Sequence, residues 1–329
     1  MIDGLRVVIV GFLVFLSVAA CSSHIHQLRT HHLHFTSTPI PNITSVRVVK
    51  HLMGETQVPE HPQRVIVLHP NLLEAAFALG IKPIAAPKSA VLQLQQLVGK
   101  LENIEDVSFE SPNLEKLLRL KPDLILGFSS HQNIYPLLSH IAPTVLATFN
   151  PIAPWKEFLN VTARALDKTE KAQQLMTNYY ARLVQFRASM GQHLQTTVVS
   201  VIELRGDRLF LPQEASFSGV ILKDAGIARP PNQSLNAQTS IRLGGAAIVF
   251  PLSWEQVGEI GGDALFIFTQ KDLNPSLQEL KTSPLWSKLK IVQLHRIHKV
   301  GFYWVGSGPI AANQVIDDLF KYLVNKRGA

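Results

Sequence analysis

The fold is decided by residues 64–80, RVIVLHPNLLEAAFALG. The nearly continuous β-branched run over 64–69 predicts a strand that is buried on both faces. Pro70 ends this strand, Asn71 caps a helix, and apolar residues at helical spacing continue as far as Gly80. A strand that passes directly into a helix is the repeating unit of an α/β protein.

The same order of elements recurs through the first half of the chain. Strands that alternate with helices predict right-handed crossovers and a mainly parallel sheet. Ligands of such sheets gather at the carboxyl ends of the strands. We expect a hairpin over 45–58, helices over 89–101, 112–120 and 133–141, and strands over 83–86, 123–128 and 143–149.

The middle of the chain, residues 154–194, carries no strand signal. From Ala172 to Met190, apolar residues advance by three or four positions, which predicts a helix of about seven turns with one apolar face. We interpret this helix as a spine between two α/β halves. The second half resumes with strands over 197–204, 208–211, 264–269 and 291–294 and with helices over 218–225, 277–289 and 309–323.

The predicted fold class is therefore α/β, with two lobes that each contain a mainly parallel sheet flanked by helices. One long spine helix joins the lobes. We place the first lobe at about 45–150, the spine helices at about 154–194 and the second lobe at about 197–329. A continuous helix between lobes resists bending, so we expect only a small hinge motion when a ligand binds.

The composition excludes several classes of protein. With 329 residues, of which 46% are hydrophobic, the chain can fill a large core and is too apolar to be disordered. Its single Cys excludes a disulfide framework. No block of basic residues of the kind that binds nucleic acid occurs. The formal net charge of +7 suits an anionic ligand or surface without identifying one.

The amino terminus has the layout of a secretory signal. Arg6 precedes an apolar stretch, Val7–Leu16, which is too short to span a bilayer, for which about 20 residues are needed. Val18–Cys21 resembles the bacterial lipobox, in which Cys21 becomes the lipidated first residue of the mature protein. We expect residues 1–20 to be a lipoprotein signal peptide. The alternative is an ordinary signal peptide with a chance Cys.

Residues 21–44 are rich in Ser, Thr, His, Pro and Asn without periodicity, which predicts a flexible tether between membrane and fold. A short His-rich tract in a tether does not need a metal-binding role, and we predict no metal site. The five histidines that could hold a metal are His24, His26, His31, His32 and His34.

Residues 127–131, GFSSH, superficially resemble the strained serine turn of an α/β-hydrolase. The second Gly of that turn is missing, because His131 occupies its place. No spacing supports an acid and a later His as partners of Ser129. A secreted hydrolase that uses Ser129 is the alternative from a different class of protein. We favour a strand-end loop that lines a cleft, and we predict no catalytic residue.

Gly306, Gly308 and Ala311 fit the dinucleotide pattern GxGxxA. Only 18 residues follow Ala311, which leaves no room for the next strand and its ribose-binding acid. We therefore exclude a dinucleotide site. Free backbone N–H groups at the start of the helix over 309–323 are predicted to form an anion site instead.

Aromatic and cationic residues at predicted strand ends and loops form the remaining signal. They suit a shallow pocket for a bulky, flat, anionic ligand, because Arg pairs with carboxylates and aromatic rings supply stacking area. A bare metal ion fits less well, since His and carboxylates are not concentrated in these loops. The predicted ligand-binding residues are Asn71, Ser129, His131, Arg205, Arg208, Phe217, Tyr303 and Trp304.

The order of these elements resembles the iron-siderophore branch of the periplasmic receptors of ABC importers for ferric siderophores, haem and cobalamin. In such receptors each lobe presents a Glu to Arg residues of the permease. The first-lobe position matches Glu115, in the NLEKL helix, and the second falls on Lys223, which reverses the charge. Asp224 beside it could substitute. The resemblance covers residues 45–325 and is carried by the stretches 48–68, 71–80, 112–126, 141–146 and 216–231.

The resemblance implies a solute receptor that is exported and lipid-anchored to a bacterial membrane through Cys21. It implies that a ferric siderophore or related iron chelate binds between the lobes and passes to permease subunits, with no enzymatic activity and no cofactor. We expect a monomer that binds no nucleic acid. Receptors for haem, cobalamin or a free metal ion are the alternatives among binding proteins.

Overall fold

The structure, a computed structural model, describes residues 45–88, 97, 99–148, 150, 154–206, 208–269 and 274–325. These residues fall in one unit, and none of their helices combines the length and the apolar character that crossing a bilayer requires. Four predictions lie outside the described residues: the signal peptide over 1–20, the Cys21 anchor, the histidine tether, and most of the helix over 89–101.

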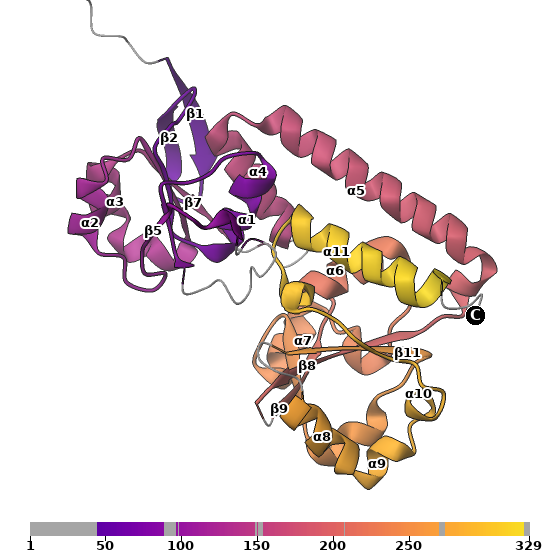
Figure 1. The fold of residues 1–329 in the computed structure, drawn as a ribbon. Helices are drawn as coiled ribbons and strands as arrows, with labels where there is room; N and C mark the ends of the chain where they lie inside the picture. The colour runs from indigo at the N-terminus through magenta and orange to yellow at the C-terminus, as the bar shows by residue number, and fades with distance from the viewer. Residues whose placement is uncertain are drawn as a thin grey trace, which may run out of the picture. The chain divides into compact units, whose positions relative to one another are not determined.

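A parallel sheet forms the centre of the first half (Figure 1). Its strand order is β5-β4-β3-β6-β7, and every neighbouring pair is parallel. All three residues of the central strand β3 are buried, which confirms a strand that is covered on both faces. The strands are β3 (Val65–Val67), β4 (Ala85–Ala86), β5 (Glu105–Asp106), β6 (Leu124–Phe128) and β7 (Thr144–Ala147).

Short helices and a hairpin complete the first half. The hairpin strands β1 (Val46–His51) and β2 (Gly54–Pro59) are antiparallel, and the Leu52 N–H donates to the Leu146 carbonyl of β7 at 3.1 Å. The helices are α1 (Pro70–Ala78), α2 (Leu114–Arg119) and α3 (Tyr135–Ile141), the last preceded by a 3₁₀ turn over Ser129–Ile134.

The prediction for the start of α1 is wrong by two residues. His69, not Asn71, caps the helix, because the His69 side chain accepts a hydrogen bond from the Asn71 N–H. Pro70 is the first helical residue, where its missing N–H costs nothing and its fixed φ suits the helix.

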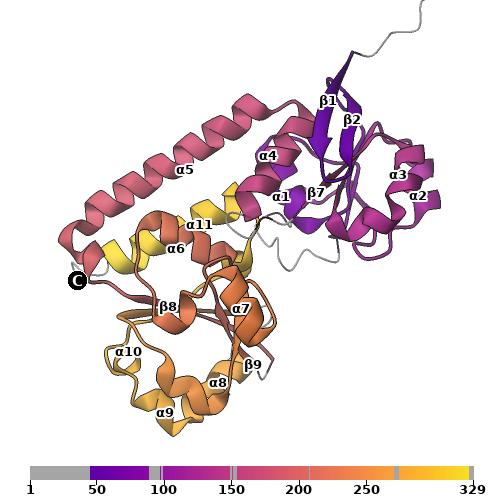
Figure 2. The ribbon, with the colours of Figure 1, turned by 180° about the vertical axis from the view of Figure 1, so that it is seen from behind.

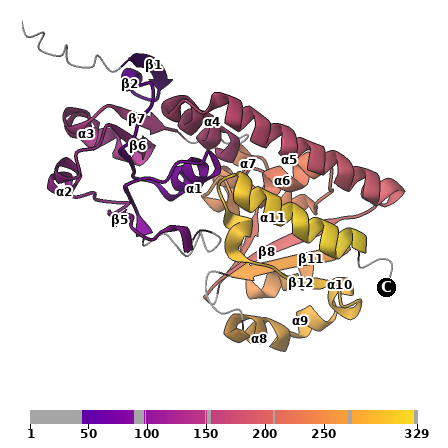
Figure 3. The ribbon, with the colours of Figure 1, turned by 45° about the horizontal axis from the view of Figure 1, so that its top comes forward.

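Two helices, α4 (Pro154–Leu166) and α5 (Thr169–Met190), form the middle of the chain. Asp167, with φ of 55°, separates them. The spine is α5, which contacts α6 and α11 and runs beside α11 in Figures 2 and 3. Its buried face consists of Ala172, Tyr179, Leu183, Phe186 and Met190, as the periodicity predicts.

The second half holds a mixed sheet with the order β10-β9-β8-β11-β12. Strands β8, β11 and β12 are parallel, whereas β9 pairs antiparallel with both β8 and β10. The strands are β8 (Val199–Arg205), β9 (Arg208–Pro212), β10 (Val249–Leu252), β11 (Ala264–Thr269) and β12 (Ile297–Lys299). The helices are α6 (Phe217–Ala225), α7 (Ala237–Gly244), α8 (Asn274–Thr282), α9 (Pro284–Ser287), α10 (Lys290–Gln293) and α11 (Pro309–Leu319).

The predicted strand over 291–294 is wrong. These residues belong to α10 and the turn after it, and the edge strand β12 begins at Ile297. Ile291 packs with Trp286 in the apolar cluster on the outer side of the sheet. An apolar run of this length fits a buried helix turn as well as a strand, and its periodicity cannot separate the two.

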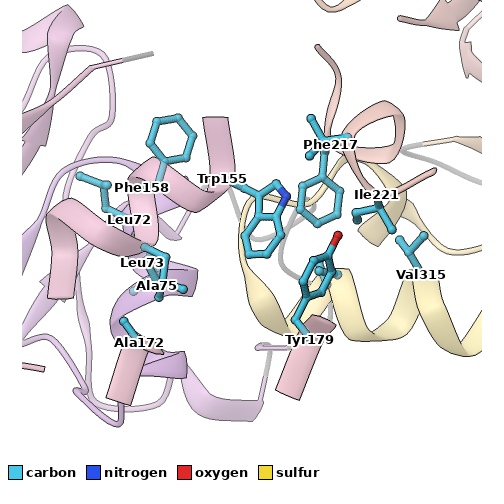
Figure 4. Packing of buried hydrophobic residues seen from close by; sticks show 14 of the residues in the cluster. Leu72, Leu73, Ala75, Trp155, Phe158, Ala172, Tyr179, Phe217, Ile221 and Val315 are labelled. Atoms are coloured by element: carbon cyan, nitrogen blue, oxygen red, sulfur yellow. The ribbon is translucent and has the colours of Figure 1, made fainter. Parts of the chain in front are cut away.

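One apolar cluster joins both halves to the spine (Figure 4). Because the cluster takes side chains from five helices, it fixes the helix ends around the site. Its members include Leu72 and Leu73 of α1, Trp155 and Phe158 of α4, Tyr179 of α5, Phe217 and Ile221 of α6, and Val315 of α11.

Candidate functional site

A cavity of about 390 Å³ lies where the strands of both sheets end. His69 follows β3, while Glu203 and Phe268 stand near the carboxyl ends of β8 and β11. The first residues of α4 and α6 and the loop before α11 also line the cavity. The cavity therefore lies at the carboxyl ends of the strands, where ligands of parallel sheets bind, as the sequence predicts.

Aromatic rings make up much of the cavity surface. Trp155 and Phe158 come from α4, Phe217 from the first turn of α6, and Phe268 from β11. The ring of Trp155 meets that of Phe217 edge-on at 6.2 Å between centroids (Figure 4). The Trp155 indole nitrogen is buried without a hydrogen-bond partner among the described residues. A flat ligand would find stacking surface on several sides.

His69 places an imidazole among the aromatic rings that line the cavity. Its Nδ1 accepts a hydrogen bond from the Asn71 N–H at 3.2 Å, and its ring lies 4.3 Å from Phe128 and 4.9 Å from Phe109. Burial, together with the nearby His131, lowers the pKa of His69 to about 3. The imidazole is therefore neutral at neutral pH.

His131 lies behind the residues that line the cavity. It is almost fully buried and does not line the cavity. Its Nδ1 accepts from the Phe128 N–H at 3.1 Å, so the proton lies on Nε2, which donates to the Phe109 carbonyl at 3.0 Å. His131 thus holds in place two residues whose rings contact His69.

Ser129 also stays off the cavity. It begins the 3₁₀ turn after β6. Within the part of the chain that the structure describes, Ser129 forms no hydrogen bond to a histidine. The arrangement of a hydrolase triad is therefore not assembled around it in these residues.

Arg205 reaches the cavity together with a buried acid. Its Nε and Nη2 donate to the two carboxylate oxygens of Glu203 at 2.5 and 2.8 Å. Glu203 is only 3% exposed, and the guanidinium lies over the Phe210 ring at 4.6 Å. Arg208, its partner across the β8–β9 turn, is exposed and does not line the cavity.

The neighbouring residues Tyr303 and Trp304 share a hydrogen-bond acceptor, but only Trp304 lines the cavity. Both donate to the same carboxylate oxygen of Asp318, Tyr303 through its hydroxyl at 2.7 Å and Trp304 through its indole at 2.8 Å. Trp304 lines the cavity and stacks on Phe266 at 4.6 Å, whereas Tyr303 does not line it. Burial and this hydrogen bond raise the pKa of Tyr303.

The predicted anion site at the start of α11 exists, but its N–H groups are not free. Glu74 of α1 is fully buried there, and its Oε1 accepts from the Ala311 N–H at 2.8 Å. Its Oε2 accepts from the N–H and the hydroxyl of Ser307 at 3.2 and 3.4 Å. Burial raises the pKa of Glu74, and the hydrogen bonds oppose the rise. A carboxylate of the chain itself therefore occupies this site.

The two predicted docking acids have different surroundings. Glu115 is on the surface with its side chain 88% exposed. Asp224 is only 19% exposed, and it accepts hydrogen bonds from Lys156 at 2.7 Å and from the Tyr179 hydroxyl at 2.6 Å. These contacts tie α6 to α4 and α5, so the Asp224 carboxylate already has an internal role.

A second hollow, of about 740 Å³, is larger but lies at the opposite end of the second sheet. Asp263 and Arg296, which line it, come immediately before β11 and β12. Its lining has few aromatic rings and its location is the amino end of the strands, so the smaller cavity is the better ligand site. The described residues contain no group of three metal-ligating side chains.

The structure brings four of the predicted ligand-binding residues to the cavity: Asn71, Arg205, Phe217 and Trp304. The other four, Ser129, His131, Arg208 and Tyr303, do not line it. The sequence analysis did not name the other lining residues as ligand-binding, and of these Glu203 gave a signal as an acid inside a buried apolar strand. The aromatic and charged residues among them are His69, Phe109, Trp155, Phe158, Glu203 and Phe268.

Two α/β halves around an aromatic cavity, with a spine helix between them, define a solute-binding protein. The chain belongs to the periplasmic binding protein family, whose model matches residues 65–302. Proteins of this family bind solutes and are not enzymes.

Known relatives bear names of iron-uptake proteins. A probable siderophore-binding lipoprotein of Bacillus subtilis, YfiY, is 32% identical over 86% of this chain and 90% of the relative. The achromobactin-binding periplasmic protein of Dickeya dadantii is 30% identical over 78% of this chain and 85% of its own. The crystal structure of SirA from Staphylococcus aureus complexed with staphyloferrin B superposes with a TM-score of 0.70 at 26% identity, covering 84% of this chain and 98% of SirA.

Proposed function

We propose that this protein is the receptor of an ABC importer and that it binds a ferric siderophore in the cavity of about 390 Å³. The observation that carries the proposal is the aromatic lining at the strand ends, because it offers stacking surface to a bulky chelate rather than ligands to a bare ion. The names of the relatives support iron chelates as the class of ligand.

Within this proposal, the ligand contacts Trp155, Phe158, Phe217, Phe268 and Trp304. Asn71 and Arg205 supply polar contacts at the same surface. A free metal ion is the weaker alternative, since the lining contributes one imidazole and one carboxylate that is already paired with Arg205.

The proposal extends to the place of the protein in the cell. Residues 1–20 are removed as a signal peptide, Cys21 carries the lipid, and residues 21–44 tether the domain over 45–325 to the membrane. Relatives that are named lipoproteins support this part. The receptor acts as a monomer and meets the permease through Glu115, whose carboxylate is exposed.

Tryptophan fluorescence tests the proposal. Trp155 and Trp304 line the cavity, whereas Trp254 and Trp286 pack in the outer cluster of the second sheet. A ferric chelate in the cavity should quench about half of the emission, because energy transfer and contact quenching fall off with distance. Trp155→Phe should remove much of the quenched component, and the matched control Trp286→Phe should leave it intact. An unchanged tryptophan fluorescence with every ferric chelate of a panel would refute the iron assignment.

The hydrolase alternative has its own test. Ser129→Ala should leave chelate binding nearly unchanged, because Ser129 does not line the cavity. An esterase activity that disappears with this substitution would overturn the proposed function.

A further inference from the structure

The charges that line the cavity cancel. Among the described residues, the charged side chains of the lining are Arg205 and Glu203, one of each sign. His69 adds no charge at neutral pH, since burial lowers its pKa to about 3. The net charge of +7 of the whole chain is therefore not concentrated where the ligand binds.

Because Arg205 is paired with Glu203, its guanidinium is not available to bind a ligand carboxylate through two N–H groups. A guanidinium grips a carboxylate best through two parallel N–H groups. The Nε and Nη2 edge of Arg205 already grips Glu203 in this way, at 2.5 and 2.8 Å. One face of the guanidinium lies over the Phe210 ring. An incoming ligand carboxylate would have to displace Glu203 to take the same edge.

Glu203 cannot easily be displaced. It lies within β8, is 3% exposed, and stands opposite Phe210 of β9 and Phe268 of β11 in the sheet. Without Arg205, its carboxylate would remain buried and unpaired, which is strongly unfavourable. An anionic ligand therefore meets a lining without net positive charge, in which the guanidinium of Arg205 is already paired with Glu203.

The positions between 45 and 325 that the structure does not describe hold few charged residues. Between residues 45 and 325, the positions that the structure does not describe contain Lys271, Asp207 and Asp272 and no other charged residue. Their sum is negative.

From this balance, and resting on the proposed function, we propose that the cavity selects ferric chelates without net negative charge, of the trihydroxamate class, and that Glu203 sets this preference. Hydroxamate groups cancel the charge of ferric iron when three of them bind it. Polycarboxylates and tricatecholates leave the complex anionic. The aromatic lining serves a neutral chelate well, because burying an uncharged surface avoids the desolvation penalty of a charge.

The test compares three probes on the intact protein: ferric desferrioxamine, ferric citrate and a ferric tricatecholate. The wild-type protein should bind ferric desferrioxamine at least about tenfold more tightly than either anionic chelate, because an anionic chelate loses hydration of its charge in a lining that offers no net positive charge in return. Glu203→Gln frees Arg205, so it should narrow the preference by about tenfold, mainly through tighter binding of ferric citrate. Glu259→Gln, an exposed acid of the same half, is the matched control and should leave all three affinities unchanged.

A second variant keeps the test decisive if Glu203→Gln does not fold, as judged by circular dichroism. Arg205→Gln leaves the carboxylate uncompensated, so it should widen the preference against ferric citrate. A wild-type protein that prefers an anionic chelate, or variants that leave the ratio of affinities unchanged, would overturn the inference while the proposed function stands. Failure to bind any of the three chelates would count against the proposed function itself.

Discussion

Glu74 joins α1 of the first half to the start of α11, and its removal should cost much of the stability of the fold. In Glu74→Ala, the N–H groups of Ala311 and Ser307 lose their acceptor inside the protein. A buried donor left without a partner costs about 1–3 kcal/mol. With the space that the missing side chain leaves, we expect the free energy of unfolding to fall by about 3–5 kcal/mol.

Urea unfolding followed by circular dichroism measures this loss, with the slope of the transition checked to be unchanged. Glu74→Gln keeps the shape but turns an NH₂ group toward one of the N–H donors, and it should lose about 1–3 kcal/mol. Glu115→Gln, an exposed acid in the same half, should change the free energy of unfolding by less than about 0.5 kcal/mol. A free energy of unfolding of Glu74→Ala within about 1 kcal/mol of the wild-type value, which is close to the scatter of the extrapolation, would refute the reasoning.

Three further predictions concern other buried contacts. His69 has a folded-state pKa of about 3 against 6.5 in the unfolded chain, so the unfolded state binds more protons between these values and stability falls as the pH decreases through them. The free energy of unfolding should fall by about 1.6 kcal/mol from pH 6.5 to pH 5 in urea titrations, and His69→Asn should abolish this component. An unchanged pH profile in that variant would contradict the assignment. Tyr179→Phe removes the hydroxyl that donates to Asp224 and should lower the free energy of unfolding by about 1–2 kcal/mol, whereas no loss would show that the hydrogen bond contributes nothing. Gly219→Ala would press its Cβ into the carbonyl oxygen of Gln213, so thermal unfolding should show a marked drop in Tm, and a wild-type Tm would show that the backbone relaxes.

The sequence was sufficient for the parts of the fold that depend on local pattern. The buried run over 64–69 became the central strand β3, and the periodic face from Ala172 to Met190 became the buried face of α5. The sequence also predicted that Arg205 and Phe217 border the ligand site. Arg205 stands at the end of a strand and Phe217 at the start of the next helix, and both positions border a ligand site in a parallel sheet.

The features that the sequence did not reveal depend on contacts between distant residues. No local sequence pattern indicates that the Glu74 carboxylate accepts hydrogen bonds at the start of α11, because its partners lie more than 230 residues away in the sequence. The helix α7 and the strand β10 were not recognised, since their segment mixes glycines and prolines with short apolar runs. Glu203 gave a local signal as an acid in a buried apolar strand, but its bidentate contact with Arg205 could not be inferred from that signal.

The central claim is that a ferric chelate sits in the aromatic cavity, and anomalous diffraction at the iron edge tests it most directly. Crystals of the protein with ferric desferrioxamine should show one strong iron peak between Trp155, Phe217 and Trp304. An iron peak in the hollow beside Asp263 and Arg296, or the absence of bound iron from crystals grown with each of the three ferric chelates at saturation, would contradict the account.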